Sequence, residues 1–141
     1  MTFGAPIRGA SGWRLDLKDA VVTQVQIDFA LGLSIFLKPD EYLFVRLETA
    51  FEFGTQEESE HVEWHEPAQL GRFAELHGAS VERIDVQESG SLTLSFGDGR
   101  QLRASPDDDY EAYQVGSQQR VGAGGWLLVA LPGGGVSAWT Q

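Results

Sequence analysis

The sequence predicts a mainly β (α+β) domain in which two antiparallel β-meanders form a sandwich or a partly open barrel, with one helix packed on the sheet. Short segments alternate apolar and polar residues, which is the period of a strand buried on one face. A similar alternation recurs 59 residues later, and only one segment has helical spacing. Because 141 residues suffice for one core, we expect a flexible N-terminal arm over residues 1–12 and a single domain over residues 13–141.

The first meander is expected over residues 13–53. A strand is expected from near Trp13, and the alternation from Val21 to Phe29 indicates a strand with one buried face. The pattern resumes from Leu33 to Leu37, stops at the turn residues Lys38-Pro39-Asp40 and returns from Tyr42 to Leu47. We expect Phe51 and Phe53 to extend this sheet.

An acidic loop and a helix are expected over residues 54–78. The stretch from Gln56 to Glu60 is predicted to be a solvated loop, since its crowded like charges repel one another. A helix of about three turns is predicted to begin at Pro67 and to end at Gly78. Its apolar stripe at i, i+3, i+4 and i+7 consists of Leu70, Phe73, Ala74 and His77, and it suits a helix that covers one side of a sheet.

The second meander and a C-terminal hairpin are expected over residues 79–141. Strands are predicted from Val81 to Val86 and from Leu92 to Phe96, and Gly97-Asp98-Gly99 then turns the chain into a third strand. The remaining predicted strands are Tyr110–Val115, Trp126–Leu131 and Val136–Trp139, with a Gly-rich loop from Gly116 to Gly125.

The two meanders align with a constant offset of 59 residues. Val22, Val25, Ile27, Leu33, Ile35, Leu37 and Leu43 then fall on Val81, Ile84, Val86, Leu92, Leu94, Phe96 and Leu102. Alternation alone supplies half of such matches, so an internal duplication and a chance similarity of two hairpins both stay open. Neither alternative names a function.

Charge and composition exclude several classes of function. The net charge of −11, from 21 acidic and 10 basic side chains, repels phosphate groups, so we expect no nucleic-acid or membrane binding. The chain has no Cys, which excludes disulfides and thiolate chemistry. Residues 1–11 lack the apolar run of a signal peptide, so we expect a cytoplasmic protein. With no nucleophile elbow and no phosphate loop, the sequence predicts no catalytic residues and no cofactor.

One cluster has the composition of a metal site. His61 and His65 lie four residues apart, with Glu63 and Glu66 between and beside them. In a helix both imidazoles would share a face, whereas in a strand they would lie about 13 Å apart. The helix is expected to start only at Pro67, so we predict no metal site here, and a small metal-dependent hydrolase is kept as an alternative.

Two acidic stretches, each flanked by aromatic residues, are the candidate binding surfaces. A turn opened by Pro106 explains the acidic residues that follow it better than a cation site does, because the alternating ligands of a calcium loop are missing. Tyr and Trp are frequent at binding hot spots, and strand alternation predicts one tyrosine inside and one outside. The candidate partner-binding residues are Asp107, Asp108, Asp109, Tyr110, Glu111, Tyr113, Glu58, Glu60, Glu63 and Trp64.

The stretch Ser105 to Tyr113, followed by Leu131-Pro132-Gly133-Gly134-Gly135 and a closing Trp139, resembles an uncharacterised family of small actinobacterial proteins. The pattern extends back to Trp13 and to residues 22–29. The family is a domain of unknown function with some similarity to immunity proteins, which neutralise toxins in bacterial competition. The resemblance implies a binding role.

Three hypotheses follow from the sequence. The first is a non-catalytic module that binds a basic protein through its acidic surface, as an immunity protein would. The second is the metal-dependent hydrolase that uses His61 and His65. The third is a structural homodimer, in which an exposed edge strand and the Gly-rich loops support self-association.

Overall fold

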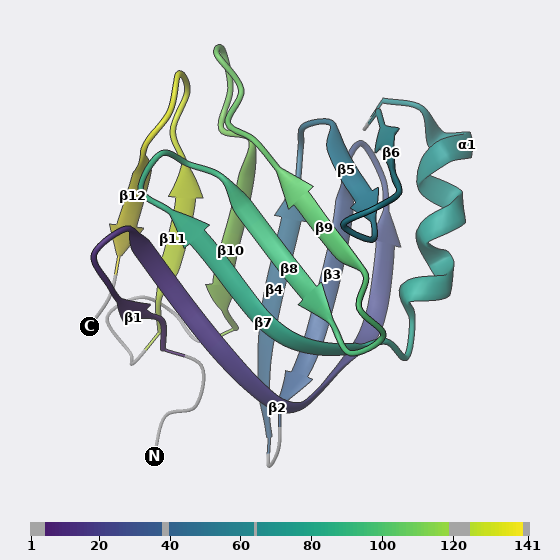
Figure 1. The fold of residues 1–141 in the computed structure, drawn as a ribbon, viewed down its shortest axis with the longest axis horizontal. Helices are drawn as coiled ribbons and strands as arrows, with labels where there is room; N and C mark the ends of the chain where they lie inside the picture. The colour runs from purple at the N-terminus through teal and green to yellow at the C-terminus, as the bar shows by residue number, and fades with distance from the viewer. Residues whose placement is uncertain (1–4, 38–39, 64, 119–124, 140–141) are drawn as a thin grey trace.

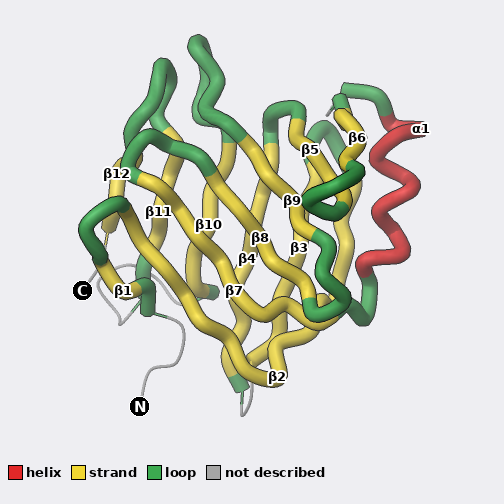
Figure 2. Tube along the Cα trace, in the orientation of Figure 1, coloured by secondary structure: helices red, strands yellow, loops and turns green. Residues whose placement is uncertain are grey.

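The computed structural model describes residues 5–37, 40–63, 65–118 and 125–139 (Figures 1 and 2). Twelve strands in these ranges form one sheet in which all strand pairs are antiparallel. The strands are β1 (Ile7–Arg8), β2 (Gly12–Ile27), β3 (Leu31–Leu37), β4 (Glu41–Leu47), β5 (Phe51–Gly54), β6 (Ser59–Val62), β7 (Ser80–Gln87), β8 (Leu92–Phe96), β9 (Gln101–Ala104), β10 (Tyr113–Ser117), β11 (Leu127–Ala130) and β12 (Val136–Trp139).

The sheet is open and folds over on itself. Its strand order is β12-β11-β10-β4-β3-β2-β7-β8-β9-β5-β6, and β1 pairs with β2 beside this path. In Figure 1 the strands β7, β8 and β9 cross in front of β10, β4 and β3, so the two halves form two layers. One cluster of buried side chains from both layers fills the space between them. The mainly β prediction is confirmed: the strands form a single antiparallel sheet that is not closed into a barrel.

Strand β2 joins the two layers because it bends. Its first part pairs with β7 and its last part with β3, and the pairing with β7 shifts register between Asp16 and Ala20. At this bend Asp19 has a φ of 56°, a left-handed conformation that Asp tolerates better than most residues. At the start of the strand, Gly12 has a φ of +149°, and a Cβ there would lie 2.2 Å from the Val86 carbonyl oxygen.

The segment from Pro67 is a shorter α-helix than expected. The helix α1 (Pro67–Leu70) continues as a 3₁₀-helix over Gly71–Leu76. Its buried residues Leu70, Phe73 and Leu76 are spaced by three, which is the period of a 3₁₀-helix. The predicted i+4 and i+7 members of the stripe, Ala74 and His77, are exposed instead.

Both meanders are present, but the constant offset does not hold across them. Val25 pairs with Leu33 and Ile84 pairs with Leu94, so β8 lies two residues beyond the position that an offset of 59 predicts. The first strands of the two hairpins do match, since each shifts register at the same place, between Val22 and Gln24 in β2 and between Val81 and Arg83 in β7. The similarity therefore includes a shared bulge as well as alternation.

Four strand predictions need correction. Strand β2 ends at Ile27, and Phe29, which was expected on its buried face, is 86% exposed. Residues 51–53 belong to β5, which pairs with β9 and β6 and does not extend the first meander.

Ser59 and Glu60 belong to the edge strand β6, where a loop was expected, and β6 pairs with β5. Strand β10 begins at Tyr113, so Tyr110 precedes it in a loop. Part of the predicted Gly-rich loop, residues 119–124, and part of the N-terminal arm, residues 1–4, lie outside the described residues. No helix in the described part of the chain has the length and apolar character to span a membrane.

Candidate functional site

The acidic turn after β9 is a fixed loop. The Asp107 carboxylate accepts hydrogen bonds from the backbone N–H groups of Asp109 (2.8 Å) and Tyr110 (3.2 Å). The Asp107 carbonyl accepts a further bond of 2.8 Å from the N–H of Gly133, in the β11–β12 turn. These bonds tie the loop to the neighbouring turn, and both turns extend from the top of the sheet in Figure 1.

This loop presents an aromatic ring among unpaired carboxylates. Tyr110 is 70% exposed, and Asp108, Asp109 and Glu111 are exposed beside it. Within the described ranges, none of these carboxylates makes an ion pair with Lys, Arg or His. We call residues 107–111 the acidic loop.

Tyr113 lies inside the core, in contrast to Tyr110. Its ring is fully buried, and its hydroxyl donates a hydrogen bond of 2.6 Å to the carbonyl oxygen of Gly90, in the β7–β8 turn. Burial raises the pKa of the Tyr113 phenol well above its usual value. Tyr113 therefore holds the base of the acidic loop, and its side chain offers no surface to a partner.

The other acidic stretch, residues 57–66, has part of its charge paired with neighbouring side chains. Glu60 pairs with Arg72 at 2.7 Å, and Glu63 pairs with His61 at 2.7 Å. Glu58 is exposed, with its carbonyl in the tight β5–β6 turn. Trp64 lies outside the described residues. Figure 1 places β6 beside α1, away from the acidic loop, so the fold does not bring the two acidic stretches together.

The imidazole rings of His61 and His65 lie beside glutamate carboxylates. The His61 ring lies between Glu52 (Nδ1 to Oε1, 2.8 Å) and Glu63 (Nε2 to Oε1, 2.7 Å). These carboxylates, Glu52 foremost, raise the pKa of His61 above its usual value. His65 lies 3.8 Å from Glu63 and from Glu66. Among the residues that the structure describes, no three such groups are arranged to hold a metal ion.

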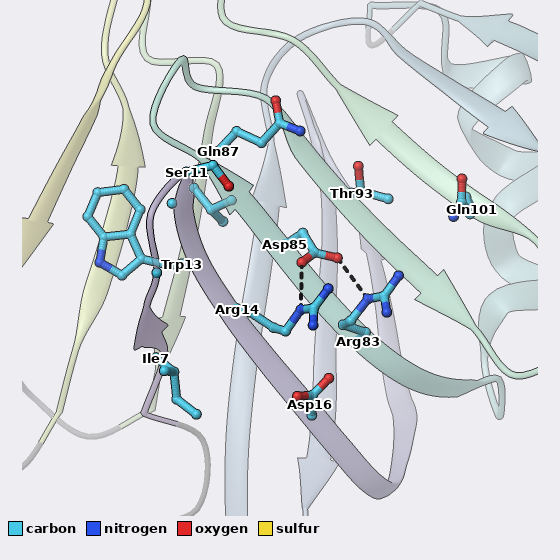
Figure 3. Close-up of a pocket in the computed structure, with 13 residues that line it drawn as sticks. Ile7, Ser11, Trp13, Arg14, Asp16, Arg83, Asp85, Gln87, Thr93 and Gln101 are labelled. Atoms are coloured by element: carbon cyan, nitrogen blue, oxygen red, sulfur yellow. Dashed lines mark hydrogen bonds and ion pairs between the residues drawn. The ribbon is translucent and has the colours of Figure 1, made fainter.

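A shallow groove of about 690 Å³ on the outer face of β2, β7 and β8 contains a group that sequence reasoning missed (Figure 3). The Asp85 carboxylate accepts from Arg14 Nε (3.2 Å) and from Arg83 Nε (2.9 Å). The Asp85 carboxylate therefore orients both guanidinium groups, each through its Nε–H group. Asp16 is the other acid in the groove, and the lining includes no His, Lys or Tyr to act as an acid or base beside it.

The same outer face carries charge across the whole layer. Register places Arg14, Asp85, Thr93, Arg103, Glu52 and His61 opposite one another in one row over six strands. Alternating signs favour such cross-strand neighbours. The sequence shows only that each residue is polar and outward-facing, because strand order decides which of them meet.

The comparisons with known proteins identify a family but no activity. A family model described as a family of unknown function (DUF6188) matches residues 13–140. No curated protein and no solved structure matches the chain.

Proposed function

The chain belongs to the DUF6188 family, whose function is unknown, and we propose that it is a non-catalytic module that binds a basic protein through its acidic loop. The observation that carries this proposal is the exposed Tyr110 on a fixed loop, whose neighbouring carboxylates make no ion pair with any cation that the structure describes. A fixed loop loses little conformational freedom on binding, which leaves more of the contact energy for affinity.

The chemistry of the acidic loop supports a cationic partner. Tyrosine supplies a rigid contact with both an apolar body and a hydroxyl, and it is frequent at binding hot spots. The surrounding carboxylates would steer a basic surface toward it and would be screened by salt. An immunity-type protein, which covers a toxin, is the specific form of this proposal that the family resemblance in the sequence implies.

The proposal favours the acidic loop over the stretch from residue 57 to residue 66. Partners of Glu60 and Glu63 would first have to displace Arg72 and His61, which offsets part of any new attraction. The carboxylates of the acidic loop need no such exchange. Glu57 and Glu58 therefore serve as a control surface of the same charge.

The test measures binding to the protein encoded by the neighbouring gene, by titration calorimetry at low and high salt. We expect the variant D108N/Y110A/E111Q to lose at least about tenfold in affinity at low salt, since it removes the aromatic anchor and two unpaired carboxylates. Asp107 stays in place because its carboxylate caps the turn.

The control variant E57Q/E58Q removes the same number of charges from exposed positions elsewhere. Its affinity is expected to fall by less than about twofold, through long-range charge alone. Equal losses in the two variants would show that only net charge matters, and full affinity in D108N/Y110A/E111Q would refute the acidic loop as the contact.

A further inference from the structure

The outer face of the other layer is almost without charge. Register places Trp139, Leu127, Gly116, Phe44, Ser34 and Gln24 opposite one another across β12, β11, β10, β4, β3 and β2. In the adjacent row the corresponding members are Ser137, Val129, Gln114, Arg46, Gly32 and Gln26. Arg46 is the one charged side chain in these two rows, and we call them the neutral face.

The contrast with the opposite layer is informative. The equivalent row there has five ionisable side chains in six positions, from Arg14 to His61. In a chain with a net charge of −11, two adjoining rows of a sheet that themselves include no carboxylate depart from the rest of the described surface. Carboxylates reach these rows at Arg46, which pairs with Asp28 at 3.4 Å and with Glu48 at 3.6 Å. Depletion of charge together with enrichment of aromatic residues is the composition of the core of a protein interface.

The apolar side chains of the neutral face are packed into a defined surface. A Cβ at Gly116 would lie 2.8 Å from Phe44 Cε1 and 3.0 Å from Leu127 Cδ1, so these two side chains lie over the glycine. In the next row beside the neutral face, Phe36 and Tyr42 are opposite each other, with ring centroids 5.1 Å apart. A groove of about 600 Å³ runs beside them, lined in part by Tyr42, Phe44 and Gln24.

The edge of the sheet next to this face is also unprotected. Strand β12 (Val136–Trp139) contains no charged residue and no proline, and Trp139 is 45% exposed. Sheet edges are usually blocked by such residues. At the other edge, β6 carries Glu60 and His61, which make ion pairs. The uncharged strand β12 is therefore both the edge of the sheet and the end of the neutral face.

From this distribution we propose that the neutral face is the contact between two copies of this chain in a two-fold dimer. Two chains of charge −11 repel each other wherever unpaired carboxylates meet, and the carboxylates of Asp28 and Glu48 at this face are already paired with Arg46. A two-fold contact uses the same patch on both copies, and an uncharged patch is complementary to itself. The proposal does not depend on the function of the acidic loop.

The size of the neutral face suits a weak dimer. Six strands of about five residues, at ~4.8 Å between strands and ~3.3 Å per residue, cover roughly 500 Å² per copy. Two copies would bury about 1,000 Å², which is at the lower limit for a specific interface. We therefore expect dissociation in the micromolar range, on the order of 1–100 µM.

The test is sedimentation velocity of the full chain from about 1 to about 500 µM, a range that spans this affinity. The wild type is expected to pass from monomer to dimer as its concentration rises. The variant Q24E/S34E places two carboxylates on the neutral face of each copy and should weaken association by at least about 100-fold. Gln24 is exposed and Ser34 half-buried, so both substitutions leave the core intact.

The matched control is T93E/Q101E, which makes similar substitutions on the charged outer face of β8 and β9. It should dimerise as the wild type does, and far-ultraviolet circular dichroism should show the same fold in all three proteins. A wild type that stays monomeric at every concentration would overturn the proposal. So would a Q24E/S34E variant that still dimerises, since the copies would then meet elsewhere.

Discussion

Replacing Tyr113 by Phe removes one buried hydrogen bond and little else. The hydroxyl donates to the Gly90 carbonyl oxygen at 2.6 Å, and the ring is fully buried. In the variant that oxygen would lose its donor inside the protein. A lost hydrogen bond with a buried acceptor left unpaired costs about 2 kcal/mol of unfolding free energy, which corresponds to about 6 °C in Tm for a domain of this size.

The same hydroxyl makes stability depend on alkaline pH. Because burial raises the pKa of Tyr113 in the folded state, its contribution is fully present below the unfolded pKa of about 10. It is lost as the pH rises above that value, because the unfolded chain then releases a proton that the folded chain retains. The stability difference between wild type and Y113F should therefore shrink above about pH 10.

Urea unfolding followed by tryptophan fluorescence at pH 7 and at several values above pH 9 measures both effects. The variant Y110F is the control, because the Tyr110 side chain is 70% exposed and its hydroxyl should contribute almost nothing. If Y113F and Y110F unfold at the same urea concentration, the Gly90 bond does not hold the base of the acidic loop. A difference between Y113F and wild type that is constant to high pH would refute the pKa argument.

Three further predictions concern the backbone, the core and the edge of the sheet. G12A should lower the unfolding free energy by more than about 2 kcal/mol, because the new Cβ would meet the Val86 carbonyl oxygen. G71A is the control and should be neutral or stabilising, since a Cβ there would meet no described atom of another segment within 4 Å. Thermal unfolding compares the two variants. F73A should cost about 3–5 kcal/mol in urea unfolding, and a loss below about 1 kcal/mol would contradict its role in the core. His61 should titrate above about pH 6.5 by NMR, with its stabilising effect lost as the pH rises through the raised pKa, and E52Q should lower that pKa; an unchanged titration would refute the Glu52 contact.

Alternation predicts most strands of the two meanders, since they have one buried face, but it fails from Val21 to Phe29. There the bulge between Val22 and Gln24 changes which residues face the core, and Ile27 and Phe29 are exposed. The segment from Leu31 to Leu37 is buried at every second residue, as its sequence implies. The edge strand β6 escapes this reasoning, since Val62 is its one buried residue and its charges suggest a loop. Pairing of Glu60 with Arg72 and of His61 with Glu52 offsets the repulsion that motivated the loop prediction.

The helix prediction fails in its details for a different reason. Spacings of three and four coexist in the sequence, so Leu70, Phe73 and Leu76 fit a 3₁₀-helix as well as Leu70, Phe73 and Ala74 fit an α-helix. Propensity does not decide between them when the segment is short and packs against a sheet. The burial of Leu76, with Ala74 and His77 left exposed, shows that the spacing of three packs against the sheet.

The candidate site could be predicted only where its residues are close in sequence. The acidic loop is a local turn, so Asp107 and Tyr110 are found by composition. Tyr110 is exposed and Tyr113 buried, but strand alternation is not the reason, because Tyr110 lies in the loop before β10. The charged and neutral faces depend on which strands are neighbours. Strand β10 lies beside β4, and this pairing alone brings Gly116 under Phe44.

Amide hydrogen exchange of the complex shows whether this chain binds a protein partner through the acidic loop. With the protein encoded beside this chain bound, we predict slower exchange at residues 107–111 and in the adjoining turn at residues 131–135, which the Asp107–Gly133 bond links to the loop. Slower exchange confined to β5 and β6, with residues 107–111 unchanged, would contradict the account.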